Sequence, residues 1–264
     1  MIEQLTLGIV QGIAEWLPVS SEGLIVLIKT NLFNQPPNYE ELIRHALFLH
    51  LGTFFAALIY FKKDVGILCK SIVQYKSQTQ ETKKLFNFLF FTTLISGILG
   101  ICLLKLMVNL VEHFEATGKS ITLIIGFLLI GTGILELRAS KPGYRNLSNL
   151  KWTDSLITGI AQGFASLPGF SRSGLTMSTL LLLKFDKEHS LKLSFLLSLP
   201  IVLAGNIILN YDQMIFSAPS LIGLGCSFVF GLITIHLLLK LAKAVNFGYF
   251  MLIFGSITIL SFFI

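Results

Sequence analysis

The chain of 264 residues is 53% hydrophobic and only 13% charged, whereas a soluble domain of this length carries about 25% charged residues. These values exclude an ordinary soluble domain and predict an all-α, polytopic membrane protein. The net charge of +6 is expected to lie in cytoplasmic loops, so no nucleic-acid partner is predicted. The three cysteines are far apart and form neither a metal-binding spacing nor a disulfide framework.

The first apolar stretch is short and interrupted. It runs from Leu5 to Trp16, is broken at Pro18, and resumes from Gly23 to Ile28. Each piece is shorter than the roughly 20 residues that a membrane-spanning helix needs. We therefore expect a re-entrant helical hairpin, which enters and leaves the membrane on one side. The polar stretch from Asn31 to Glu41 is expected to follow as an external loop.

Six longer apolar runs follow, and each is long enough to span a bilayer if some tilt is allowed. They are Leu42–Phe61, Leu85–Val108, Ile121–Leu137, Leu191–Ile208, Leu221–Leu241 and Phe247–Ile264. The polar segment Lys62–Lys84 is expected to be a solvated loop. A second interrupted stretch, Asp154 to Lys184, separates the third run from the fourth. The predicted fold therefore has six transmembrane helices and two re-entrant helical hairpins.

The two interrupted stretches are copies of one pattern. Gly-x-x-Gln-Gly begins at Gly8 and again at Gly159, and each copy continues through Leu-Pro to a serine-rich run that ends at Gly23 or Gly174. Three spans follow each copy, so the second half must be inverted relative to the first. We expect one integral-membrane domain, residues 1–264, built from halves of about 1–140 and 150–264. Broken helices at corresponding positions of an inverted repeat indicate the binding site.

The basic residues predict the orientation. Fifteen of the twenty lysines and arginines fall in loops and ends that are cytoplasmic if both termini lie outside. This is the bias that the positive-inside rule describes. The two hairpins would then enter from opposite faces and meet near the midplane.

The two breaks contain the residue types of an oxyanion site. Gln11 and Glu15 are four residues apart and share one helix face, and Arg172 stands in the second break. Arginine matches phosphate oxygens bidentately, and helix N-termini with hydroxyl caps bind anions. A phosphate or diphosphate ligand is therefore expected near the small residues of both breaks, which are Ser20, Ser21, Gly169, Ser171, Ser173 and Thr176.

A carboxylate beside a phosphate needs an explanation. Mg²⁺ or Ca²⁺ held by Glu15 and Gln11 would supply one, because it bridges the carboxylate to the anion. The alternative is a Glu15–Arg172 ion pair that only joins the hairpins. His50, in the middle of the first span, is a further candidate because polar groups are costly there; a packing hydrogen bond is its alternative. His45 is a weaker candidate.

Two motifs resemble a known family. Gln11-Gly-Ile-Ala-Glu15-Trp-Leu-Pro18-Val-Ser20-Ser21, together with Pro168-Gly169-Phe-Ser171-Arg172-Ser173-Gly174-Leu-Thr176, is similar to the undecaprenyl-diphosphate phosphatases, also called bacitracin-resistance proteins. The resemblance covers essentially the whole chain. It implies a cation-dependent hydrolysis of undecaprenyl or another polyprenyl diphosphate to the monophosphate, outside the inner membrane. This reaction recycles the lipid carrier for peptidoglycan and other cell-wall glycans and confers bacitracin resistance.

By position, the resemblance makes Glu15 the essential acid, Ser21 a nucleophile or phosphate ligand, and Arg172 the diphosphate clamp. Ser171, Ser173 and Thr176 would complete the phosphate cradle. The chain departs from the family pattern at Gln11, where glutamate is frequent, and at Leu24, where many members carry a histidine. His50 is expected to supply that histidine's role, ahead of Glu22.

A second function class fits the same architecture. Inverted repeats with broken helices are typical of transporters, so a transporter or flippase for an anionic or phosphorylated lipid is the alternative to the enzyme. The oligomeric state is left open, a homodimer included.

Overall fold

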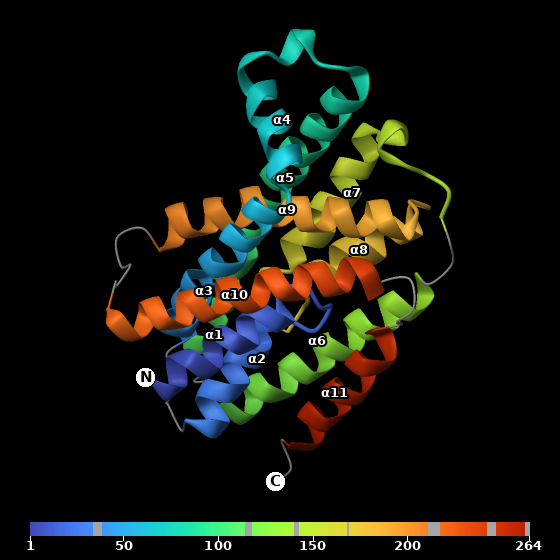
Figure 1. Ribbon diagram of the computed structural model, residues 1–264. Helices are drawn as coiled ribbons and strands as arrows, with labels where there is room; N and C mark the ends of the chain where they lie inside the picture. Colours follow the sequence, from blue (N-terminus) through green and yellow to red (C-terminus); the bar gives the residue numbers. More distant parts are fainter. Residues whose placement is uncertain are drawn as a thin grey trace.

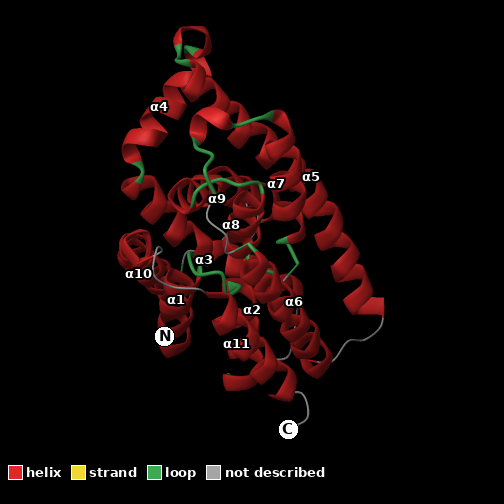
Figure 2. Ribbon diagram, turned by 90° about the vertical axis from the view of Figure 1, so that its right-hand side faces the viewer, coloured by secondary structure: helices red, strands yellow, loops and turns green. Residues whose placement is uncertain are grey.

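The computed structural model describes residues 1–33, 39–113, 118–139, 143–167, 169–210, 217–241 and 247–261. All elements in these ranges are helices (Figure 2), which confirms the all-α prediction. The α-helices are α1 (Ile2–Ala14), α2 (Ser21–Leu27), α3 (Tyr39–Tyr60), α4 (Lys62–Val73), α5 (Gln80–His113), α6 (Gly118–Arg138), α7 (Trp152–Phe164), α8 (Arg172–Leu182), α9 (Lys187–Leu209), α10 (Ala218–Leu241) and α11 (Phe247–Ser261). A short π-helix, Ile28–Leu32, and two 3₁₀ turns, Tyr75–Ser77 and Leu147–Asn149, complete the described elements. The middle of the predicted loop between Asn31 and Glu41, residues 34–38, lies outside the described residues, and its two ends belong to the π-helix and to α3.

Several helices have the length and apolar character of membrane spans. Among the described residues, three meet both criteria: Gln80–Leu110, Lys187–Leu209 and Ala218–Lys240. A fourth span results if Arg44–Tyr60 and Lys62–Val73, which are bent by 91°, count as one. α6 covers the predicted run Ile121–Leu137, and α11 covers the predicted run Phe247–Ile264 up to Ser261, the last residue described. The chain is a multi-pass membrane protein.

The expectation of a loop at Lys62–Lys84 is wrong. This segment forms α4, a 3₁₀ turn and the start of α5, and it projects from the body of the molecule (Figure 1). Val65 and Leu68 are three residues apart and pack against the main hydrophobic core, so one face of α4 is apolar. The lysines of this segment led to the prediction of a loop, although the spacing of its apolar residues fits a short amphipathic helix.

Each broken helix packs against a helix from the other half of the chain. α1 lies along α10 and α7 lies along α5, while α6 pairs with α11. A Cβ atom on Gly8 would lie 2.2 Å from the carbonyl oxygen of Gly223, and one on Gly163 would lie 2.7 Å from the side chain of Leu99. The glycines of the repeated motif therefore permit close helix approach.

Both breaks end in a serine that caps the next helix. Ser20 has a positive φ of 53° and accepts a hydrogen bond from the Gly23 amide at α2. Ser171 accepts one from the Gly174 amide at α8. These caps confirm that each second helix begins at the serine-rich run. Pro168 of the second break lies outside the described residues.

The two breaks touch each other. The Gly169 amide donates to Ser20 Oγ at 3.1 Å, and Ser173 Oγ donates to the Leu17 carbonyl at 2.7 Å. Residues from the two copies of the motif thus meet inside the protein, as expected for paired broken helices.

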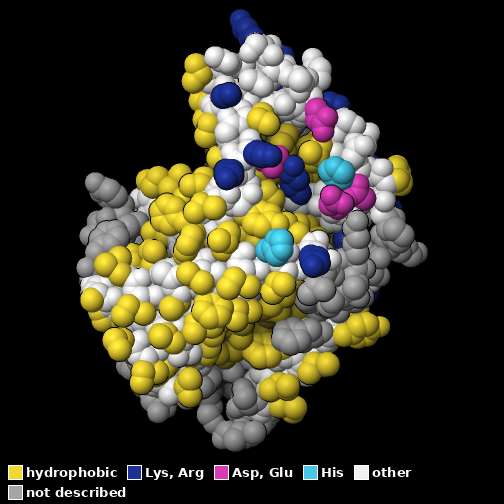
Figure 3. Space-filling model, viewed as in Figure 1, with side chains coloured by type: hydrophobic (Ala, Val, Ile, Leu, Met, Phe, Trp, Pro, Cys, Tyr) yellow, Lys and Arg dark blue, Asp and Glu magenta, His cyan; other side chains and the backbone are white. Residues whose placement is uncertain are grey.

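Apolar side chains cover much of the surface. Figure 3 shows them across the body on one face, with lysines and arginines gathered over the projecting α4 and α5 region. Large hydrophobic residues of several long helices are more than half exposed, among them Ile98, Phe127, Ile233 and Ile253. Soluble proteins rarely expose contiguous apolar surface of this kind, so this surface suits a lipid environment.

Candidate active site

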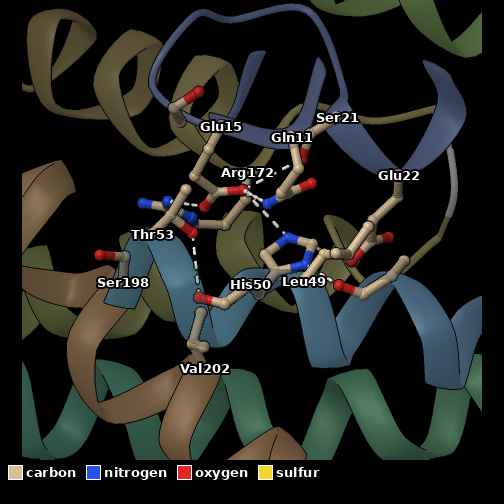
Figure 4. A network of polar contacts seen from close by, with 12 residues as sticks. Gln11, Glu15, Ser21, Glu22, Leu49, His50, Thr53, Arg172, Ser198 and Val202 are labelled. Atoms are coloured by element: carbon tan, nitrogen blue, oxygen red, sulfur yellow. Dashed lines mark hydrogen bonds and ion pairs between the residues drawn. The ribbon is translucent and has the colours of Figure 1, made fainter. Parts of the chain in front are cut away.

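Glu15 lies at the centre of a buried polar cluster. It follows α1 directly and is 5% exposed. Its Oε1 accepts a hydrogen bond from Arg172 Nη2 at 2.5 Å, and its Oε2 accepts from Gln11 Nε2 at 2.9 Å and from Ser21 Oγ at 3.0 Å (Figure 4). The structure therefore brings together four of the predicted site residues.

His50 reaches the same carboxylate from α3. Its Nε2 lies 3.0 Å from Glu15 Oε2, and its Nδ1 lies 2.6 Å from the Ala46 carbonyl oxygen. Because a carbonyl can only accept, Nδ1 must carry a proton. The contact between Nε2 and the carboxylate then holds a second proton between these two residues. His50 thus belongs to the cluster and is placed to transfer a proton.

Arg172 is the first residue of α8 and joins two elements. Besides Glu15, it donates from Nη1 to the Ser194 carbonyl at 2.8 Å, and its guanidinium carbon lies 5.9 Å from the centre of the Trp16 ring. These hydrogen bonds use two of its five N–H groups. Arg172 also lines a small hollow beside Glu15 and His50, where an anion could reach its guanidinium.

The cluster lines a cavity that encloses about 880 Å³ of space, its open mouth included. Glu15, Glu22, His50 and Arg172 are the charged or titratable residues of its lining. Its apolar walls come mainly from α5 and α9: Gly97, Gly100, Ile101, Leu104, Ile201, Val202, Ala204, Gly205, Ile208 and Leu209. Charged side chains and an apolar groove between α5 and α9 thus line one cavity. Sequence reasoning missed the groove, because its two walls are far apart in the chain.

The predicted phosphate cradle is partly engaged in the protein's own contacts. Ser20, Ser21 and Ser171 line a small hollow around Arg172 and His50. In contrast, Thr176 Oγ1 lies 2.6 Å from Ser194 Oγ and donates to the Arg172 carbonyl. Ser173, Gly169 and Gln11 are likewise absent from the described lining of this hollow. In the structure, Gly169 and Ser173 join the two breaks, Thr176 contacts Ser194, and Gln11 donates to Glu15.

Comparison with known proteins decides the family. The family of the bacitracin resistance protein BacA matches residues 4–259. The chain belongs to this family. An undecaprenyl-diphosphatase of Methanococcoides burtonii is 42% identical over 99% of this chain and 98% of its own length. Relatives of the same name from Methanothrix thermoacetophila and Methanococcus maripaludis are 33% and 35% identical, over 98% and 94% of this chain and 95% of their own length in each case. The predicted resemblance is confirmed.

Leu24, at the position where many BacA family members are expected to carry histidine, does not face the cluster. It packs against an apolar group that includes Val26 and Ile125. Glu22 lines the cavity instead, and its Oε1 lies 3.9 Å from His50 Nε2. His45 lies apart, between Gln4 at 2.8 Å and Lys29 at 3.0 Å. Of the histidines considered, His50 is the one at the cluster.

The cluster also contains an unused ligand atom. Gln11 Oε1 is buried and has no hydrogen-bond partner. The described residues contain no group of three or more His, Cys, Asp or Glu side chains arranged to hold a metal ion. A cation here would therefore need ligands beyond such side chains.

Proposed function

We propose that this chain hydrolyses undecaprenyl diphosphate, or a related polyprenyl diphosphate, to the monophosphate and phosphate. The observation that supports this most is the single cavity that joins Arg172 and Glu15 to the apolar groove between α5 and α9. A lipid diphosphate needs a charged site for its head and an apolar path for its tail. The relatives are named as phosphatases, which does not favour the transporter alternative.

The reaction begins with the terminal phosphate at the free N–H groups of Arg172. Ser21 Oγ attacks its phosphorus while Glu15, 3.0 Å away, accepts the hydroxyl proton. The bond to the bridging oxygen breaks, and His50 supplies a proton to the departing polyprenyl monophosphate. Water then hydrolyses the phosphoserine, which releases phosphate and restores the hydroxyl. In the competing route, water attacks directly and Ser21 only binds the phosphate; isolation of a phosphoserine on Ser21 distinguishes the two.

A divalent cation fits the donor atoms of this site. Mg²⁺ commonly binds one or two carboxylates together with substrate phosphate oxygens, and Ca²⁺ also prefers oxygen ligands. Glu15 and the unpartnered Gln11 Oε1 would hold it, with Glu22 nearby on the cavity wall. Such an ion would neutralise charge that develops on the phosphate oxygens.

We further propose six spans and two re-entrant hairpins in an inverted repeat. The crossed packing of α1 with α10 and of α7 with α5 supports two equivalent halves, as does the contact between the breaks. The excess of lysine and arginine in the loops on one side supports termini outside. The site would then open toward the outer face of the cell's inner (plasma) membrane, where the enzyme recycles the carrier lipid for cell-wall glycans and confers bacitracin resistance.

Phosphate release by purified protein in detergent tests the function. We expect release from C55 diphosphate, its loss with EDTA, and its return with Mg²⁺ or Ca²⁺. The variant Arg172→Ala should release almost none. Absence of release by the wild-type protein with every divalent cation would refute the phosphatase assignment.

A further inference from the structure

Three polar residues of the cavity have no part in the reaction described above. They are Ser96 of α5, Gln162 of α7, and Ser166 just beyond α7. Gln162 Nε2 donates to Ser96 Oγ at 2.8 Å. Gln162 Oε1 and Ser166 Oγ are both buried and have no partner. Because an unpaired buried polar atom destabilises a protein, such groups require an explanation.

The position of this cluster suggests its ligand. The small hollow at the head and the large cavity share Glu15, Glu22, His50, Ala165 and Arg172. Ser96, Gln162 and Ser166 line only the large cavity, which continues into the apolar groove. They therefore lie on the tail side of the charged cluster, where the phosphate next to the prenyl chain would lie.

We propose that Ser166 and Gln162, supported by Ser96, bind the α-phosphate of the lipid diphosphate. This inference rests on the proposed function. The Ser166 hydroxyl donates to a phosphate oxygen. The Gln162 amide can also turn over, because Ser96 can donate its hydroxyl proton to the Gln162 oxygen in place of the Thr93 carbonyl, to which it donates at 3.2 Å. The unpartnered atom of Gln162 is then its amide nitrogen, so Gln162 and Ser166 can both donate hydrogen bonds to the phosphate.

The repeat explains why this subsite is neutral. Gln162 and Ser166 occupy the positions in the second copy that Gln11 and Glu15 occupy in the first. The second copy thus has a hydroxyl where the first has a carboxylate. A carboxylate at both positions would repel the diphosphate. At these two positions, the first copy therefore supplies the acid for the chemistry, and the second copy supplies neutral groups for the phosphate that stays on the lipid.

Enzyme kinetics on full-length variants tests this subsite. We would compare Ser166→Ala, Gln162→Leu and the double variant with Ser178→Ala. Ser178 is a matched control, since its hydroxyl is also buried without a partner but does not line either hollow. The measurements are KM and kcat for a polyprenyl diphosphate, the inhibition constants of polyprenyl monophosphate and of inorganic phosphate, and direct binding of the monophosphate.

For the double variant we expect KM, and the inhibition and dissociation constants of the monophosphate, to rise about tenfold. Inhibition by inorganic phosphate should not change, because that ion fits the Arg172 end. Ser178→Ala should match the wild type. Unchanged monophosphate binding in the double variant overturns the subsite, as does an equal loss of phosphate and monophosphate binding. A wild-type protein that binds the monophosphate but releases no phosphate would instead refute the proposed function.

Discussion

The carboxylate of Glu15 and the guanidinium of Arg172 lie 2.5 Å apart although 157 residues separate them in the chain. One belongs to the first break and the other to the second, so each copy of the motif contributes one charge. Both side chains are largely buried. Removing one partner leaves the other charge buried and uncompensated, which is strongly destabilising.

Glu15→Gln should lower kcat for phosphate release at least a hundredfold, because the amide accepts a proton from Ser21 poorly and no longer neutralises Arg172. Glu22→Gln is the matched control: its carboxylate lines the same cavity, and we expect a loss of about tenfold or less. Both are measured as phosphate release in detergent. A Glu15→Gln enzyme with wild-type turnover would contradict the role of Glu15 as proton acceptor.

Arg172→Lys should raise KM for the lipid diphosphate about tenfold or more. Lysine cannot donate to Glu15 and Ser194 and also present a planar fork to a phosphate. Arg145→Lys is the control, because Arg145 also pairs with a buried acid, Asp154, at 2.5 Å but lies outside the cavity. Its effect should appear in thermal stability, with KM unchanged. Equal KM changes in the two variants would show that the Arg172 effect is not local.

His50→Ala should lower kcat about a hundredfold, since it removes the group that holds a proton beside Glu15. Added imidazole should restore part of the rate if proton transfer is the function lost. His45→Ala, which changes a histidine in the same helix but away from the cluster, should retain activity. Full activity in His50→Ala would show that His50 does not replace the family's histidine.

Ser20→Ala should destabilise the protein by about 1–2 kcal/mol and also reduce turnover. The hydroxyl accepts from both Gly23 and Gly169, so its loss removes a helix cap and a link between the two breaks. Thr79→Ala removes an exposed cap at the start of α5 and should lower stability by a similar or smaller amount without affecting turnover. Thermal unfolding and phosphate release are measured on the same samples; normal turnover in Ser20→Ala would argue against a positioning role.

Gly8→Ala should markedly reduce stability and yield, because its Cβ would meet the Gly223 carbonyl oxygen of α10 at 2.2 Å. Gly225→Ala is the control in α10, where an added Cβ meets nothing within 4 Å. That variant should unfold at the wild-type temperature. If both variants behaved alike, close packing of α1 on α10 would not be important for stability.

Much of the architecture could be predicted without the fold. Apolar length identified the membrane class, and Pro18 with the serine-rich runs located both breaks. These signals are local, because neighbouring residues largely decide them. Apolar length determines transfer into lipid, proline restricts the backbone, and serine caps the next helix. The acid and the arginine could be assigned to the site for the same reason, because charges are rarely left in membrane segments without a function.

Other features depended on which segments pack together. A hydroxyl can cap a helix, bind a neighbour or face a ligand, and only its surroundings separate these roles; hence Thr176 contacts Ser194 while Ser21 reaches Glu15. The orientation of His50, the groove between α5 and α9, and the unpaired Gln162 and Ser166 all arise from contacts between distant parts of the chain. The sequence by itself determined where the two helices are broken and which polar residues stand at the breaks, because that information is local. The tertiary structure decided which atoms meet and where the apolar groove forms, because those depend on long-range packing.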